Sequence, residues 1–146
     1  MKYKEFLSTF SQEEFCPFCH FDDKDIVFES RSFYVVLARA PYCIDHFLII
    51  PRRHVVFLHE LDEEEKNELW GLTEEWNSKV RQYHQGASIL LRDVPTKMGL
   101  KRSINHLHLH IIPDCPVGVE KSDQRIFLSD EEYTKTVQEL KQKYLN

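Results

Sequence analysis

The fold of this chain is decided by the stretch HLHLHII at residues 106–112, in which histidine alternates with an aliphatic residue. Successive side chains of a β-strand point to opposite faces, so Leu107, Leu109 and Ile111 are expected to face the core. The three histidines would then line the other face, about 6.6 Å apart. A polar strand face that happens to use histidine is the plain alternative. Three imidazoles in register favour a chemical site instead.

Apolar runs and turn residues around this stretch predict the other elements. We expect five strands, at residues 26–29, 33–37, 46–50, 88–91 and 103–112. A capping-box pattern beginning at Asp62 opens a long helix that Gly86 would stop, and a second such pattern at Ser129 opens a C-terminal helix over 129–144. Strands before and after a long helix, with hairpin-like neighbours, predict an α+β fold with a mainly antiparallel sheet.

Length and composition limit the function classes. The 146 residues predict one domain, and 19 basic against 24 acidic side chains give a net charge of −5. An acidic chain is a poor general binder of nucleic acid, and we find no apolar run long enough for a membrane span. The charged N-terminus does not resemble a signal peptide, so we expect a cytoplasmic protein with reduced cysteines.

The sequence Cys16-Pro-Phe-Cys19 has the spacing of a zinc knuckle. A structural zinc site needs four ligands, and the chain has no second CxxC pair, so distant histidines are the best partners. His54 and His106 are the candidates. A redox disulfide and a plain buried pair remain the alternatives for this motif. The single cysteines 43 and 115 are expected to be small buried hydrophobes.

The row of histidines could serve either of two chemistries. Neighbouring imidazoles on one face can share a catalytic zinc ion. Alternatively, a neutral imidazole is a good nucleophile near pH 7 and can form a covalent intermediate with phosphorus, while a second imidazole holds or protonates oxygens. Residue spacing alone leaves both chemistries open.

Three segments together resemble the histidine-triad family: HLHLHII at 106–112, HFLIIPRRH at 46–54 and CPFC at 16–19. The resemblance covers about residues 16–113, leaving 114–146 as a C-terminal helical extension to which it assigns no role. It implies a histidine-triad (HIT) fold, with a five-stranded antiparallel sheet and one long helix, usually paired into a homodimer. It also implies hydrolysis or transfer at the α-phosphate of a nucleotide, through a covalent nucleotidyl-histidine.

The resemblance also implies roles for single residues. His108 would be the nucleophile, His110 would contact the phosphate or the leaving group, and the carbonyl of His106 would hold the other ring nitrogen of His108. Ser103 would contact phosphate. In zinc-bearing relatives the first histidine is a metal ligand, which implies a structural zinc site made of Cys16, Cys19, His54 and His106.

Two departures from the family pattern bear on the substrate. Ala38 stands where nucleoside-binding relatives carry an acidic residue for the ribose hydroxyls. The loop before the triad is basic, with Lys101 and Arg102 nearest to Ser103. It is either a solvated surface loop or a clamp for a polyphosphate or an acidic leaving group. His110, in place of the glutamine of the related uridylyltransferases, favours a hydrolase.

We therefore expect a hydrolase of dinucleoside polyphosphates, nucleoside phosphoramidates or related nucleotidyl conjugates. A nucleotidyltransferase, a non-catalytic nucleotide- or partner-binding dimer and a catalytic zinc site on the triad are the alternatives.

Overall fold

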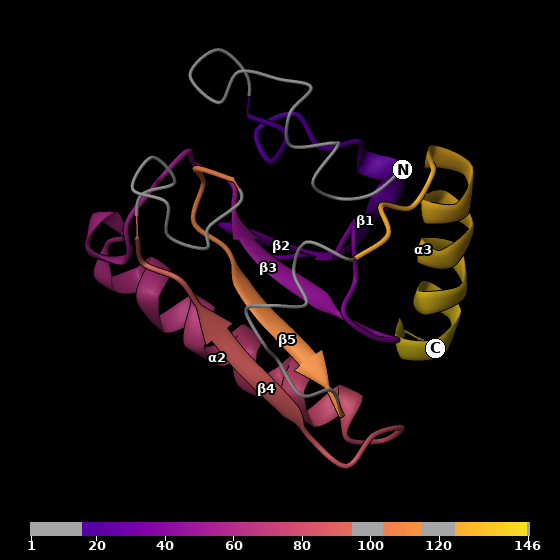
Figure 1. Ribbon diagram of the computed structural model, residues 1–146. Helices are drawn as coiled ribbons and strands as arrows, with labels where there is room; N and C mark the ends of the chain where they lie inside the picture. The colour runs from indigo at the N-terminus through magenta and orange to yellow at the C-terminus, as the bar shows by residue number, and fades with distance from the viewer. Residues whose placement is uncertain (1–15, 95–103, 115–124, 146) are drawn as a thin grey trace.

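The computed structural model describes residues 16–94, 104–114 and 125–145. Its centre is a five-stranded sheet in the order β1-β2-β3-β5-β4, in which every neighbouring pair is antiparallel. The strands are β1 (Ile26–Glu29), β2 (Phe33–Leu37), β3 (Phe47–Pro51), β4 (Ala87–Leu91) and β5 (Leu109–Pro113). The helices are η1 (Asp23–Asp25), η2 (Leu58–Glu60), α2 (Glu63–Val80) and α3 (Asp130–Leu145). The expected α+β architecture is confirmed (Figure 1).

The long helix α2 begins where the capping pattern predicts. The Asp62 carboxylate accepts the Glu65 backbone N–H at 2.8 Å, and Glu65 in turn accepts the Asp62 N–H at 3.0 Å. This reciprocal cap satisfies two amide donors that have no partner within the helix. The stripe of Leu69, Trp76 and Val80 is buried against the sheet. The helix ends at Val80, before the predicted stop, and residues 81–85 form a turn that leads to Gly86.

The C-terminal helix α3 stands next to β1 (Figure 1), and its apolar face joins the same large core as that of α2. Its buried face consists of Tyr133, Val137, Leu140 and Tyr144. The ring of Tyr144 meets that of Phe47 at 5.3 Å between centroids. The predicted C-terminal helix is thus part of the main core. Within the described part of the chain, we find no helix long and apolar enough to cross a membrane.

Strand alternation sorts the side chains between two faces. Odd-numbered residues such as Val35, Ile49 and Ile111 join the large core under α2 and α3. Even-numbered residues of β2 and β3, such as Val36 and Leu48, form a smaller cluster on the opposite face with Phe18. The predicted core positions of the histidine stretch are confirmed, because the apolar residues between its histidines belong to the large core.

The predicted fifth strand, 103–112, is wrong at its beginning. β5 starts only at Leu109, so His106 and His108 precede the strand and only His110 lies in it. The Leu107 N–H donates to the carbonyl of Val55, at 2.8 Å, in a segment that is itself not a strand. The chain around His106 is therefore hydrogen-bonded to the segment after β3 and does not belong to the sheet.

Candidate functional site

His108 is held by the backbone of its own segment. Its Nδ1 lies 2.7 Å from the carbonyl oxygen of His106. A carbonyl oxygen can only accept, so Nδ1 carries the proton and Nε2 is the nitrogen with the lone pair. The ring of Phe18 packs edge-on against His108 with 5.1 Å between centroids, which further fixes the imidazole. The arrangement leaves His108 with one nucleophilic nitrogen.

His110 is oriented by a second, buried histidine. The backbone N–H of Tyr42 donates to His46 Nδ1 at 3.1 Å, so the His46 proton sits on Nε2. His46 Nε2 then donates to His110 Nδ1 at 2.9 Å. With its Nδ1 accepting, His110 carries its own proton on Nε2. The chain from Tyr42 through His46 therefore makes His110 a hydrogen-bond donor beside His108, whose ring centroid is 4.9 Å away.

Burial keeps His46 and His110, the two histidines of this hydrogen-bond relay, neutral. Desolvation, followed by the charge of Arg125 and then by His108, lowers the pKa of His46 to about 3. Desolvation also holds the pKa of His110 well below its ordinary value, with smaller effects from His108 and His46. A neutral pair is what the assigned proton positions require, since a charged imidazole would have no acceptor nitrogen.

Cys16, Cys19, His54 and His106 converge on one point, and their ligand atoms all lie within 4.8 Å of one another. His106 Nε2 donates to the carbonyl of Pro51 at 2.8 Å, which leaves its Nδ1 lone pair facing the thiols. That Nδ1 lies 3.4 Å from Cys16 Sγ and 3.5 Å from Cys19 Sγ, and His54 Nδ1 lies 3.1 Å from Cys19 Sγ. Ligands of a tetrahedral zinc ion stand about 3.5 Å apart, so this donor set fits zinc.

The two thiols of the motif are not joined as a disulfide. Burial and the neighbouring Cys16 raise the pKa of Cys19 to about 11. The Cys19 thiol therefore holds its proton near neutral pH unless a cation sits between the sulfurs, because a bound cation favours the thiolate. With two imidazole lone pairs also pointing inward, the chemistry of the cluster favours a closed metal site over a redox pair.

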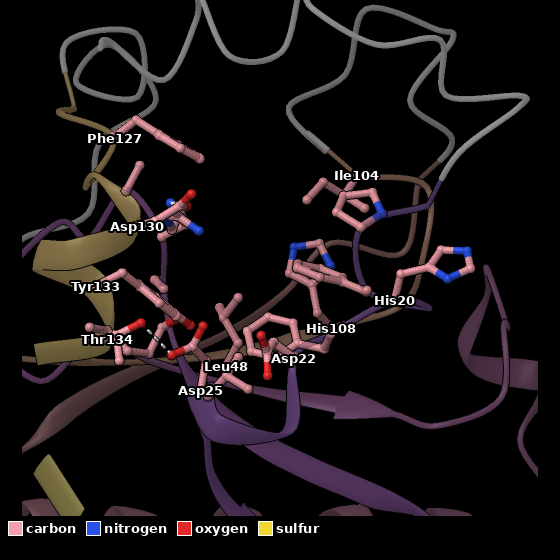
Figure 2. A pocket seen from close by; sticks show the side chains of 18 of the residues that line it. His20, Asp22, Asp25, Leu48, Ile104, His108, Phe127, Asp130, Tyr133 and Thr134 are labelled. Atoms are coloured by element: carbon pink, nitrogen blue, oxygen red, sulfur yellow. Dashed lines mark hydrogen bonds and ion pairs between the residues drawn. The ribbon is translucent and has the colours of Figure 1, made fainter. Parts of the chain in front are cut away.

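A cavity of about 380 Å³ lies beside the triad histidines. His108 and His110 line one part of it, and residues of α3 line another (Figure 2). The wall also includes Ala38 at the end of β2 and Arg92, from the basic loop that the sequence singled out. The cavity is large enough to hold a nucleoside monophosphate unit.

The sequence-predicted residues fall into three groups. The structure brings His108 and His110 to the cavity and places His106 with the cysteines. The expected phosphate contacts lie outside the described residues; these are Ser103, Arg102 and Lys101. The residue patterns single out neither His46 nor the cavity walls from α3 and η1. The only signal for His46 was its place at the start of HFLIIPRRH.

Comparisons with known proteins agree with this geometry. The HIT domain matches residues 21–116, from just before η1 to just past β5. A curated protein of Arabidopsis thaliana, named bifunctional bis(5′-adenosyl)-triphosphatase/adenylylsulfatase FHIT, is 28% identical over 142 residues, which is 96% of this chain and 74% of that protein.

Solved structures of histidine-triad proteins have a similar fold. A hypothetical histidine triad nucleotide-binding protein from Sulfolobus tokodaii strain7 is similar with a TM-score of 0.68 and 24% identity, covering 90% of this chain and 93% of that one. A Zn-bound histidine triad family protein from Mycobacterium smegmatis has a TM-score of 0.63 and 20% identity, covering 90% and 96%. At these identities the likeness shows a shared fold. Because the HIT domain matches well over half of its length, this chain belongs to the family of HIT-domain proteins.

Proposed function

We propose that this protein is a hydrolase that cleaves dinucleoside polyphosphates and related nucleotidyl conjugates at the α-phosphate. The observation that carries the proposal is the pair of proton positions at the cavity. His108 presents a lone pair on Nε2, and His110 beside it presents an N–H. A nucleophile and a donor placed together suit attack on a phosphoryl group. The name of the Arabidopsis thaliana relative supports a dinucleoside polyphosphate as substrate.

The reaction proceeds in two displacements. His108 Nε2 attacks the α-phosphorus and forms a P–N bond, while the P–O bond to the leaving nucleotide breaks and its electron pair stays on the leaving oxygen. His110 Nε2–H donates to the oxygens on which charge develops. Water then attacks the same phosphorus, the P–N bond breaks with its electrons returning to His108, and a nucleoside monophosphate and a proton leave. The hydrogen bond to the His106 carbonyl stabilises the positive charge on His108.

The cysteine and histidine cluster has a structural role in this proposal. Cys16, Cys19, His54 and His106 would hold zinc in a closed, four-ligand site, which has no open position for water or substrate. The cluster ties the turn at 16–19 to the segment before β5. Phe18 lies in that turn and touches His108, so the cluster positions one side of the nucleophile. A structural site also argues against the alternative of a catalytic zinc on the triad.

Replacement of the nucleophile tests the reaction. In a panel of diadenosine triphosphate, diadenosine tetraphosphate and adenosine phosphoramidate, we expect His108→Ala to lower kcat by about a thousandfold or more. The exposed His59, outside the cavity, gives the matched control His59→Ala, which should keep wild-type turnover. Radiolabelled substrate should leave an acid-labile adduct on the wild-type protein alone. Equal turnover by wild type and His108→Ala would rule out the proposal.

One observation favours a second candidate, a non-catalytic nucleotide-binding protein. The buried Ala38 contributes only a methyl group to the cavity wall, where a polar side chain could hold a nucleoside. Tight binding of nucleotides, without turnover of any member of the panel and without a labelled adduct, would favour this function. A nucleotidyltransferase would instead pass the nucleotidyl group to an acceptor other than water, which product analysis distinguishes.

A further inference from the structure

The C-terminal segment forms part of the cavity that contains His108. Its contribution comes from residues beyond the HIT-matched 21–116, namely Arg125, Phe127, Asp130, Tyr133 and Thr134. Figure 2 shows Phe127, Asp130, Tyr133 and Thr134 on one side of the pocket and His108 on the other. The segment beyond the HIT-matched residues therefore lines the same cavity as His108, and its polar groups can contribute to specificity.

Arg39 fastens this segment to the sheet. The Leu128 N–H donates to the Arg39 carbonyl at 3.0 Å, and Arg39 Nε donates to the Leu128 carbonyl at 2.8 Å. The guanidinium of Arg39 lies 4.6 Å from the ring centre of Phe127 and 4.8 Å from that of Tyr133, and it forms an ion pair with Asp130. The Arg39 and Asp130 charges are thus used to hold the wall in place.

Asp25 and Thr134 are joined by a hydrogen bond at the same end of the cavity. Asp25 comes from η1, and Thr134 comes from the first turns of α3. The Thr134 hydroxyl donates to Asp25 Oδ1 at 2.8 Å, and both half-buried side chains line the cavity (Figure 2). In the described part of the chain, no basic group lies within ion-pair distance of this carboxylate. Its second oxygen therefore remains able to accept hydrogen bonds.

The sheet register places Asp25 near Ala38. Ile26 of β1 lies opposite Val36 of β2 in an antiparallel pair. The residue before Ile26 is therefore a neighbour of the residues that follow Val36, among them Ala38. Ala38 has no polar group, and the other two carboxylates of the described cavity wall, Asp22 and Asp130, form ion pairs with Lys24 and Arg39. Asp25 is therefore the carboxylate at this corner that is best placed to meet a nucleoside.

We propose that Asp25, oriented by Thr134, is a specificity-determining residue that accepts hydrogen bonds from the nucleoside of the substrate. The inference rests on the proposed function, since it assumes a nucleotide at His108. An ionised carboxylate only accepts hydrogen bonds, so its partner must be a donor. A nucleoside offers two such sources, the cis-diol of ribose and an exocyclic amine of the base.

Binding of nucleoside monophosphates, measured by titration calorimetry, tests the proposal without depending on turnover. Asp25→Asn keeps the shape and the bond from Thr134 but replaces the second oxygen with an NH₂ group. We expect the Kd for AMP to rise about tenfold, the value of one charge-assisted hydrogen bond. Thr134→Val, an isosteric change on a different element, should raise it by about threefold.

Two matched controls come from the same elements. Asp23→Asn changes an exposed carboxylate in η1, and Thr136→Val changes a helix hydroxyl that bonds to the Glu132 carbonyl; neither residue lines the cavity. Both should bind AMP as the wild type does. Loss of affinity in the controls equal to that in Asp25→Asn would overturn the proposal, because the effect would then not belong to the cavity.

The ligand series separates the two donors. If the ribose diol is bound, wild type should bind 2′-deoxy-AMP about tenfold more weakly than AMP, and Asp25→Asn should bind the two equally. If the amine is bound, the same pattern should separate AMP from IMP. A wild-type Kd for AMP in Asp25→Asn would overturn the inference while leaving hydrolysis intact. Absence of AMP binding and turnover in the wild type would overturn the inference and the proposed function together.

Discussion

At the scale of single residues, three hydrogen bonds decide what each histidine can do. His106 donates from Nε2 to Pro51, His108 donates from Nδ1 to His106, and His110 accepts at Nδ1 from His46. Three imidazoles within five positions thus present three different groups to their surroundings. One offers a lone pair to the thiols, one offers a lone pair to the cavity and one offers an N–H to the cavity. Alternation along the chain predicts their placement but not their proton positions.

The role of His46 is tested by two substitutions that differ in one donor. His46→Leu removes the donor to His110, whereas the amide of His46→Gln can still donate near the position of Nε2. Without the donor, the His110 proton is free to move to Nδ1, and the donor to the phosphate is lost. We expect His46→Leu to lower kcat about tenfold to a hundredfold with little change in KM. The kcat of His46→Gln should lie between that of His46→Leu and that of the wild type. Equal kcat values for the two variants would show that His46 acts only through packing.

At the scale of elements, two polar clusters join segments that are far apart in sequence. The first is the cysteine and histidine cluster, which links the turn at 16–19, the chain after β3 and the chain before β5. The second is centred on Asp45, just before β3. Its buried carboxylate accepts from His84 at 2.7 Å, from Lys143 at 2.6 Å and from Tyr144 at 2.5 Å. The second cluster ties α3 and the turn after α2 to the sheet.

Metal removal tests the first cluster. We expect about one zinc per chain by elemental analysis, and a chelator or Cys16→Ser should lower Tm by several degrees, because the bound ion contributes folding free energy. We expect turnover to fall only to the extent that loss of the metal displaces His108. Complete loss of activity without any change in Tm, followed by recovery on adding metal, would instead indicate a catalytic ion. Cys43→Ser, in a cysteine outside the cluster, is the control.

The Asp45 cluster predicts a pH dependence of stability. Burial alone would raise the pKa of Asp45, but hydrogen bonds from Lys143, Tyr144 and His84 outweigh it and lower the pKa below its ordinary value of 3.8. Since the folded pKa is the lower one, this stabilisation is present above about pH 4 and is lost as the pH falls through the folded pKa.

Asp45→Asn isolates this contribution. Asp45 has a backbone φ of 66°, a left-handed conformation that asparagine also adopts readily, so the substitution preserves the turn. We expect the free energy of unfolding at pH 7 to fall by about 2 kcal/mol, and the difference from wild type to shrink below pH 4. Thermal unfolding at pH 7 and pH 3 measures both. A constant difference at the two pH values would contradict the assigned role of the charge.

At the scale of the whole molecule, the two faces of the sheet differ in what they carry. The large core under α2 and α3 lies on one face, and the smaller cluster with Phe18 lies on the other and forms part of the cavity wall, which residues of α3 complete at one end. The edge strand β4 and the neighbouring surface of α2 carry apolar side chains that face water. The exposed fraction is 65% for Trp70 and 42% for Ile89. A second cavity, lined by Leu58, Trp70 and Leu91, adjoins this edge.

The homodimer that the family resemblance implies stays a prediction, and we expect this edge to be its interface. An exposed strand edge with large apolar neighbours is a strong site for pairing with a second copy. Trp70→Glu should therefore shift the sedimentation velocity from dimer to monomer. Tyr83→Glu, which changes an exposed aromatic outside that cavity, should leave the dimer intact. A monomeric wild type would exclude the proposed interface.

The sequence alone predicted the fold class, the faces of the strands and the CPFC motif as half of a metal site, and the family resemblance implied His54 and His106 as the other half. The fold class, the strand faces and the CPFC motif depend on local periodicity or spacing, so that information lies within a few neighbouring residues. The start of β5 was missed because Leu107 bonds to Val55, which lies far away in the chain.

Only the tertiary structure decided the proton positions of the relay and the cavity wall. His46 reaches His110 across 64 positions, and Thr134 reaches Asp25 across 109. Such contacts form when the core brings distant segments together, and no periodic pattern marks them beforehand. The chemistry of the triad is therefore readable from the chain, whereas the shape and the hydrogen-bonding groups that select a substrate arise from packing.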